Sequence, residues 1–274
     1  MELSKTILGI AVAISMACAT TSTLAATGHG DVHKPAHSQA EKRTSHSEHA
    51  AKWGYKGSIG PAHWGNLSDQ YILCRTGKAQ SPIDFHHVFS AGRTALDLDY
   101  HVAELAIENN GNTIKISYPA GSYLKVAGKD YKLLQFHYHA PSEHTERGRF
   151  HEMEIHFVHQ AADGTLAVIG VFIDEGPENL ALREIWDHLP RSVNQKKTVG
   201  QEIINARDLI PEGAGFYRYM GSLTTPPCSE GVNWFVIKRP IYASKKQLDK
   251  FRAIMQGNNR PVQPVNQRLI MDLQ

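Results

Sequence analysis

Two stretches of the chain decide its fold: residues 131–139 read YKLLQFHYH, and residues 150–159 read FHEMEIHFVH. Both stretches alternate large apolar residues with polar or ionisable ones, which is typical of strands that bury one face. A polar loop that contains Pro141 and Gly148 separates them. We therefore predict two strands here, connected by this loop.

Successive side chains of a strand point to opposite faces, so residues two apart share a face. On the first strand Gln135, His137 and His139 share one face, and on the second strand Glu154, His156 and Val158 do. If the strands are antiparallel neighbours, the imidazoles of His137, His139 and His156 converge.

Three neutral nitrogen ligands with an open fourth position are typical of a catalytic zinc, because that arrangement lowers the pKa of a bound water to about 7. A structural zinc would require a fourth protein ligand, usually a cysteine. Gln135 and Glu154 each precede a candidate ligand by two positions, where they can accept the second N–H of an imidazole. A His-x-His pair alone is a weak signal, but the third histidine and these two acceptors favour a metal site.

Further apolar runs predict strands over residues 112–118, 166–173 and 232–238, the second of them central and buried on both faces. Helical spacing predicts helices over residues 182–189 and between Ser244 and Gly257. The predicted fold class is mainly β (α+β): a large central, mostly antiparallel β-sheet with a few peripheral helices and the zinc site on the sheet.

The N-terminal region predicts export. Residues 1–26 have the pattern of a signal peptide, residues 27–52 that of a His-rich disordered linker, and residues 53–274 that of the catalytic domain. We expect a periplasmic protein, with full secretion or a lipid anchor at Cys18 as alternatives. The linker histidines either capture metal loosely or belong to a solvated spacer.

Composition excludes some functions. The formal net charge is +2 without a Lys/Arg-rich run, which argues against nucleic-acid binding, and no apolar segment beyond the N-terminus is long enough to span a membrane. The 16 histidines outnumber the 9 Phe or the 10 Tyr and indicate metal. Once the signal peptide is removed, Cys74 and Cys228 either pair, which an oxidising compartment favours, or remain as buried thiols.

The sequence resembles the alpha-class carbonic anhydrases of the bacterial secreted type. The resemblance covers residue 53 to the end and rests on blocks in the family's order: WGY at 53–55, QSPID at 80–84, QFHYH at 135–139, SEHT at 142–145, EIHFVH at 154–159, GSLTTPPC at 221–228 and NNRP at 258–261.

The resemblance implies a zinc lyase that hydrates CO₂ reversibly to bicarbonate and a proton, by attack of zinc-bound hydroxide on CO₂ in an apolar pocket. One Zn²⁺ per chain would be held by His137, His139 and His156, while Thr224 and Glu143 would orient the hydroxide. The implied pocket comprises Val158, Val168, Leu223, Thr225, Val232 and Trp234.

The resemblance also implies a Cys74–Cys228 disulfide, inhibition by sulfonamides or anions, a homodimer, and cis peptide bonds before Pro82 and Pro227. One position departs from the family: Asn112 stands where the family commonly has a proton-shuttling histidine. Asn does not titrate near neutral pH, so we expect proton transfer to limit turnover and imidazole buffer to raise the rate.

Three other functions compete with this one. A zinc-free binding module should lack a ligand, whereas all three histidines, Thr224 and Glu143 are present. A zinc hydrolase of phosphates would need a basic clamp or a second metal, and neither is evident. A metal-scavenging protein would depend on the His-rich tract, and metal stoichiometry would distinguish it.

Overall fold

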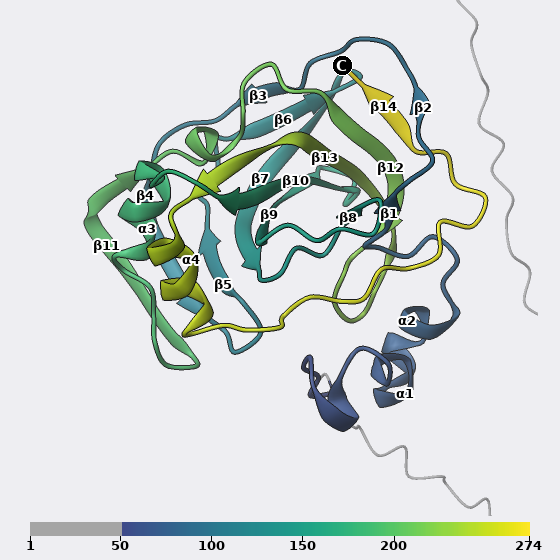
Figure 1. Ribbon diagram of the computed structural model, residues 1–274, viewed down its shortest axis with the longest axis horizontal. Helices are drawn as coiled ribbons and strands as arrows, with labels where there is room; N and C mark the ends of the chain where they lie inside the picture. The colour runs from purple at the N-terminus through teal and green to yellow at the C-terminus, as the bar shows by residue number, and fades with distance from the viewer. Residues whose placement is uncertain (1–50) are drawn as a thin grey trace, which may run out of the picture. The chain divides into compact units, whose positions relative to one another are not determined.

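The computed structural model describes residues 51–274, so the predicted signal peptide and most of the predicted linker lie outside the described residues. Twelve strands form one mixed sheet, and its main path has the order β11-β4-β5-β7-β9-β10-β13-β12-β14-β2. Strands β6 and β3 extend the sheet beside β7, and β1 pairs with β8 in a separate two-stranded sheet. Figure 1 shows the sheet curving through the molecule. The predicted fold class is confirmed.

The strands have these bounds: β1 Asp84–Phe85, β2 Phe89–Ser90, β3 Asp97–Asp99, β4 Ala103–Asn109, β5 Ile114–Ser117, β6 Tyr123–Val126, β7 Lys129–His139, β8 Thr145–Glu146, β9 Met153–Ala161, β10 Leu166–Glu175, β11 Gln195–Ile204, β12 Phe216–Ser222, β13 Glu230–Ala243 and β14 Met271–Leu273.

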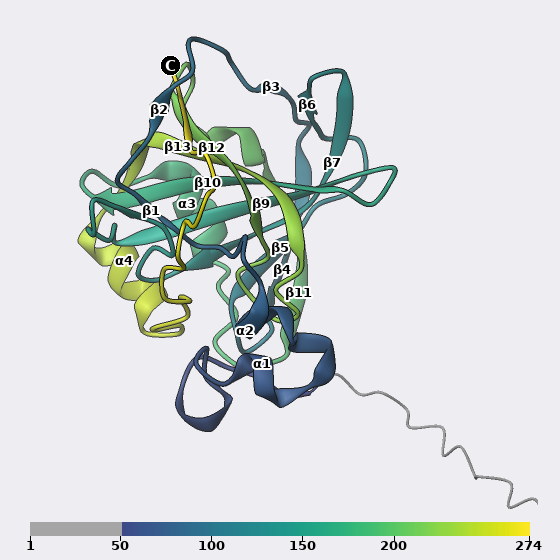
Figure 2. The ribbon, with the colours of Figure 1, turned by 90° about the vertical axis from the view of Figure 1, so that its right-hand side faces the viewer.

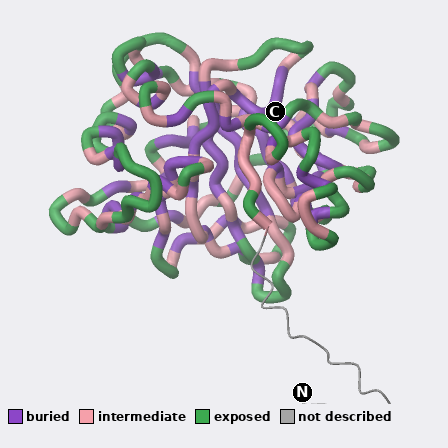
Figure 3. The backbone as a smooth tube through the Cα atoms, turned by 90° about the horizontal axis from the view of Figure 1, so that it is seen from below, coloured by how far each residue is buried: buried purple, intermediate pink, exposed green. Residues whose placement is uncertain are grey.

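The centre of the sheet reflects apolar patterning. Strand β10 is buried along most of its length, as its continuous apolar run predicts, and it lies antiparallel to β9 and parallel to β13. Strand β7 pairs antiparallel with β9, which confirms the neighbours assumed for the two histidine-bearing strands. Figure 3 shows that buried backbone lies mainly in the interior of the molecule, while exposed segments lie mainly at its periphery.

Two of the helices pack together beside the sheet. Helix α3 (Leu180–Trp186) and helix α4 (Lys245–Arg252) lie side by side in Figure 1, with the rings of Trp186 and Phe251 5.7 Å apart. Ser244 caps α4 through a capping box with Gln247, as a serine before an apolar-periodic segment predicts. Both helices end earlier than predicted, and after α4 the backbone turns so that Gly257 N–H donates to the carbonyl of Ala140.

The other two α-helices of residues 51–274 are short. Helix α1 (Trp64–Leu67) and helix α2 (Leu73–Thr76) lie together beyond the strand ends in Figure 2. The 3₁₀ turns are η1 Gly57–Ile59, η2 Asp69–Tyr71 and η3 Ala206–Leu209. No helix among residues 51–274 is long and apolar enough to cross a membrane.

The predicted strand over residues 150–159 is wrong at its start, because β9 begins only at Met153. His151 lies in the loop before this strand. Its backbone N–H donates to Ser142 Oγ, and its carbonyl accepts from the Ser142 backbone N–H. Its ring lies between Asp174, at 2.9 Å, and Glu146, at 3.3 Å. Polar partners therefore hold residues 150–152 out of the sheet.

The predicted cysteine pair forms a disulfide. Cys74, in α2, and Cys228, before β13, are bonded across a sequence separation of 154 residues. The bonds before Pro82 and Pro227 are cis, as the resemblance implies, and the Ala140–Pro141 bond is cis as well.

Candidate metal centre

Three histidines converge on the sheet face that β7 and β9 share. His137 and His156 are directly opposite each other, and His139 lies opposite Glu154. The nitrogen atoms that His137, His139 and His156 offer all lie within 4.8 Å of one another. The alternation of the two strands therefore brings together the three residues that the sequence singled out.

Each ring has a partner on the nitrogen that points away from the cluster. His137 Nδ1 donates to Gln135 Oε1 at 2.8 Å, His139 Nδ1 to the Asn258 carbonyl at 2.7 Å, and His156 Nε2 to Glu154 Oε1 at 2.9 Å. These acceptors fix the tautomers, so Nε2 of the first two rings and Nδ1 of the third present lone pairs to the centre. His139 Nε2 is buried and has no hydrogen-bond partner among the described residues.

The environment keeps the three rings neutral. Burial lowers the pKa of His137 well below its usual value, lowers that of His139 to about 4, and lowers that of His156. A metal ligand must be a neutral imidazole, so no proton has to be displaced near neutral pH. Three uncharged donors with open lone pairs, one of them buried without a partner, fit a zinc ion.

Glu154 organises the surroundings of this cluster. Besides His156, its Oε1 accepts from His144 Nδ1 at 2.7 Å, and its Oε2 accepts from the backbone N–H groups of Glu143 and His144, both at 2.9 Å. Burial alone would raise its pKa, but His144 and His156 hold it well below the usual range. Glu154 is thus an ionised carboxylate between two imidazoles, which explains why His144, Glu154 and His156 also cluster.

A second carboxylate, Glu143, faces the same centre. Its Oε1 accepts from the Arg260 backbone N–H at 2.7 Å, while its Oε2 lies 3.5 Å from His139 Nε2 and 3.8 Å from His156 Nδ1. Burial raises the pKa of Glu143 to about 7, against the opposing influence of His156 and of a hydrogen bond from the Thr224 hydroxyl. The structure therefore brings the predicted Thr224 and Glu143 together beside the histidines.

A cavity of about 150 Å³ opens onto this centre. It is lined by Trp53, Tyr55, Asn110, Asn112, Thr113, Lys115, Gln135, His137, His139 and Thr225. Edge-to-face contacts of 5.3–5.7 Å among the rings of Trp53, Tyr55 and Trp64 hold the first described segment at this place. Asn112, at the predicted shuttle position, is one of the lining residues.

Five of the six predicted pocket residues lie in one apolar cluster, which reaches His156 through Trp234. Val168, Val232 and Trp234 are buried in one cluster, and Val158 and Leu223 pack against it. The Trp234 ring lies 4.8 Å from that of His156. Of the predicted pocket residues only Thr225 is among those that line the polar cavity.

Two supporting residues could not be identified from the sequence. The Asn258 carbonyl accepts from His139, and the buried Arg260 holds Glu143 through its backbone while its guanidinium donates to Gln80, to the Ser81 carbonyl and to the Cys74 carbonyl. Both belong to the block NNRP at 258–261, but a role carried by backbone atoms leaves no trace in residue type.

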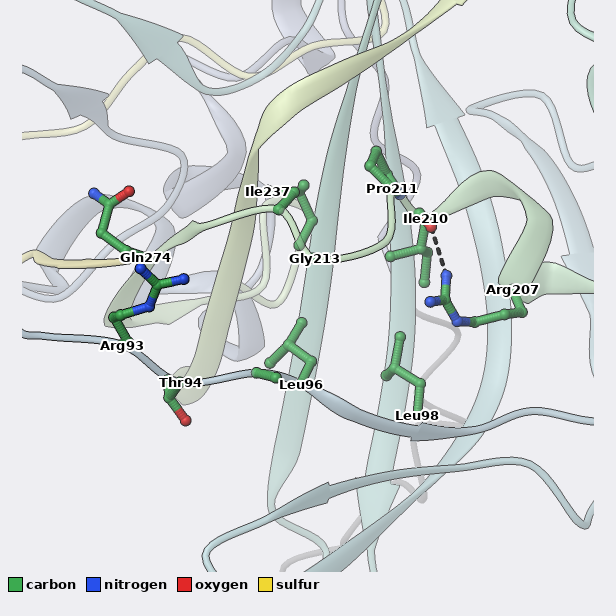
Figure 4. A pocket seen from close by; sticks show the side chains of 12 residues that line it. Arg93, Thr94, Leu96, Leu98, Arg207, Ile210, Pro211, Gly213, Ile237 and Gln274 are labelled. Carbon is green, nitrogen blue, oxygen red and sulfur yellow. Dashed lines mark hydrogen bonds between the residues drawn. The ribbon is translucent and has the colours of Figure 1, made fainter.

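A separate cavity of about 310 Å³ lies away from the histidine cluster (Figure 4). Leu96, Leu98 and Ile237 form part of its wall, with Arg93 and Arg207 at its sides. Arg207 already donates to the Ile210 carbonyl at 2.6 Å and pairs with Glu212. No histidine or carboxylate side chain of the described residues lines this cavity, so the metal centre belongs to the smaller one.

Comparisons with known proteins agree with the geometry. The profile of the eukaryotic-type carbonic anhydrase family matches residues 59–274. A carbonic anhydrase of Nostoc sp. is 43% identical over 225 residues, which are 80% of this chain and 85% of the relative. A carbonic anhydrase of Pectobacterium atrosepticum is 42% identical, and the match covers 80% of this chain and 90% of the relative.

Among solved structures, the alpha-carbonic anhydrase of Thermovibrio ammonificans in complex with the inhibitor sulfanilamide superposes with a TM-score of 0.79. It is 46% identical, and the match covers 81% of this chain and all of that one. By its sequence, its fold and its cluster of three histidines, the chain belongs to the eukaryotic-type, or alpha, carbonic anhydrase family and is a carbonic anhydrase.

Proposed function

We propose that this chain hydrates CO₂ reversibly to bicarbonate and a proton, with one zinc ion held by His137, His139 and His156. The observation that carries the proposal is the set of three inward-facing nitrogen lone pairs, each fixed by a partner on the far side of its ring. Zinc bound by three neutral ligands would lower the pKa of a water molecule at the open fourth position to about 7, and so supply a nucleophile at neutral pH.

The protein's own contribution is orientation. Glu143 is held by the Arg260 backbone N–H and accepts the Thr224 hydroxyl, as the influence of that hydroxyl on the pKa of Glu143 indicates. Because the Thr224 hydroxyl donates its proton to Glu143, its oxygen can only accept a hydrogen bond from an attacking hydroxyl group. One lone pair of the attacking oxygen is then aimed at the substrate carbon, and such positioning accounts for a large part of catalysis.

The substrate is small, neutral and without a net dipole, so it requires an apolar surface. Val158, Val168, Leu223, Val232 and Trp234 form an apolar cluster, which reaches His156 through the Trp234 ring. Thr225, on the polar side of the cavity, would contact the product oxygens. The proposed site thus has an apolar side for CO₂ and a polar side through which bicarbonate and the proton leave.

Proton release is the step for which this chain is least equipped. Asn112 lines the cavity, but its side chain cannot titrate near neutral pH. Its backbone N–H donates to Asn110 Oδ1 at 2.9 Å, and its backbone carbonyl accepts from the Asn258 side-chain amide at 3.1 Å. We infer that an external buffer must carry the proton and that proton transfer limits turnover.

Three further elements of the proposal concern context. Residues 1–26 would direct export, with the periplasm as the destination. The catalytic domain at 53–274 would follow a linker, and two copies would form a homodimer. Sulfonamides and small anions would inhibit at the metal, by analogy with the sulfanilamide complex of the Thermovibrio protein.

Metal stoichiometry tests the proposal. The full chain should retain one zinc per molecule in the presence of a competing chelator, and His139→Ala should retain none while staying folded. Retention of tight zinc by His139→Ala would place the metal elsewhere, for example on the His-rich tract, and would overturn the proposed site.

A further inference from the structure

One charged residue that lines the cavity has no role in the proposed mechanism. Lys115, on β5, lies directly opposite His137 on β7, and on its other side it lies opposite Glu108 on β4. Residues directly opposite each other in antiparallel strands share a face. Glu108, Lys115, His137 and His156 therefore form one row across the sheet that leads to the metal centre.

Lys115 is the one residue with a permanent charge among the ten that line the cavity. The two histidines of the lining are neutral, since burial lowers the pKa of both. The other lining residues are tryptophan, tyrosine, asparagine, glutamine and threonine. A single cation in a small, partly closed cavity concentrates its field there, because little water is available to screen it.

The ammonium of Lys115 is only loosely paired. Its Nζ lies 3.5 Å from Glu108 Oε2, longer than the 2.7–2.9 Å of a strong charge-assisted hydrogen bond. An ammonium has three donors, and within residues 51–274 Glu108 is the one acidic partner within ion-pair distance. Both side chains are partly exposed, 31% for Lys115 and 23% for Glu108, so the remaining donors can reach a ligand from solvent.

The two residues of this pair stand at different distances from the metal centre along the row. Neighbouring strands lie about 4.8 Å apart, so the Lys115 position is one strand from His137, whereas the Glu108 position is two strands away. Lys115 also lines the cavity, whereas Glu108 does not, so an anion in the cavity lies nearer to the positive charge than to the negative one. The net field favours a small anion at this place, even though the pair is neutral overall.

We propose that Lys115 makes the cavity a binding site for small monovalent oxyanions, and that it binds the oxygens of bicarbonate beside the metal centre. The assignment of bicarbonate rests on the proposed function; the anion site itself does not. Neutral CO₂ gains nothing from this charge, so Lys115 distinguishes the product from the substrate. Glu108 positions the ammonium and moderates its field, which limits how tightly the product is held.

The test is a titration of the zinc-loaded, ¹⁵N-labelled full chain with sodium bicarbonate at constant ionic strength, followed through the backbone amide shifts around Lys115. From the Coulomb energies at these spacings, Lys115→Gln should bind bicarbonate about fivefold more weakly. Lys115→Arg should restore the affinity, and Glu108→Gln, twice as far away, should strengthen it about twofold. The control Lys246→Gln changes an exposed charge outside the cavity lining and should leave the affinity unchanged.

Each outcome decides between the two claims. Equal affinity of wild type and Lys115→Gln, or weaker binding by Glu108→Gln, overturns the anion site. Bicarbonate binding that depends on Lys115 in a chain that does not hydrate CO₂ supports the anion site and overturns the proposed function. Inhibition of CO₂ hydration by bicarbonate that weakens in Lys115→Gln in proportion to the binding supports both.

Discussion

Glu154→Gln is the substitution whose effects can be worked out most directly from the hydrogen bonds. The carboxylate accepts four N–H groups: two from imidazoles, at 2.7 and 2.9 Å, and two from backbone amides, both at 2.9 Å. A glutamine side chain has almost the same shape but replaces one oxygen with an NH₂ donor. The new NH₂ group must then face either the two imidazole N–H groups or the two backbone N–H groups, and neither pair can bond to it.

Neither orientation of the amide preserves the site: one weakens metal binding directly, and the other destabilises the loop that holds residue 154 in place. If the NH₂ faces the rings, His156 must accept at Nε2 and carry its proton on Nδ1, the atom that faces the centre. If the NH₂ faces the loop, two buried backbone N–H groups lose their acceptor, at about 1–3 kcal/mol each. Loss of such a partner typically weakens metal affinity about 10- to 100-fold, or about 1.4–2.8 kcal/mol.

The assay is a zinc competition titration with a chromophoric chelator, on wild type, Glu154→Gln and Glu104→Gln. Glu104 is an exposed residue of β4, so its substitution removes the same charge without touching the centre. The reasoning would be refuted by a folded Glu154→Gln that binds zinc within about twofold of wild type. Equal weakening in Glu104→Gln would show that net charge, rather than the tautomer of His156, controls the affinity.

Three further predictions concern other parts of the molecule. Burial lowers the pKa of His159 to about 4, so this histidine is neutral in the fold, where Tyr100 donates to its Nε2 and its Nδ1 donates to the Ala167 carbonyl. Its unfolded-state pKa is about 6.5, so its contribution to stability is complete above pH 6.5 and is lost as the pH falls toward 4, by about 3 kcal/mol. Urea unfolding should show a flatter profile for His159→Gln in this window, and parallel profiles would contradict the assignment. Replacement of Cys74 and Cys228 by serine should lower the free energy of unfolding by at most about 5 kcal/mol, since the bond closes a loop with a sequence separation of 154 residues; unchanged denaturation under oxidising conditions would count against this. Asn112→His should raise the CO₂ hydration rate in weakly buffering solution and abolish the gain from added imidazole, and a rate independent of imidazole in the wild type would show that another group carries the proton.

Much of the central sheet could be predicted, because its strands carry strong alternation. The runs over 131–139 and 166–173 correspond to β7 and β10, and the faces assigned to His137, His139 and His156 follow from strand geometry alone. The peripheral strands could not be predicted in the same way. The two residues of β2 are both exposed, and β11 is polar along most of its length, so pairing rather than apolar patterning defines them.

The limits of prediction at the site have a similar cause. The sequence predicts the role of Gln135, because this side chain lies two positions from a ligand on the same strand face. The Asn258 carbonyl is 119 residues away from its partner His139, so no local pattern predicts it. The predicted start of β9 is wrong for another reason. The sequence pattern at 150–152 suits a strand, but contacts with Ser142, Asp174 and Glu146 hold His151 in a loop. Contacts between distant segments decide such cases.

The most direct test of the central claim is stopped-flow CO₂ hydration by the full chain, measured zinc-loaded, after chelation and after zinc is restored. The account predicts fast hydration with zinc, loss of the rate on chelation and its return on reloading, with a rate that increases with imidazole concentration. One tightly bound zinc per chain without measurable hydration would contradict it and would leave a zinc-binding protein with the fold of a carbonic anhydrase.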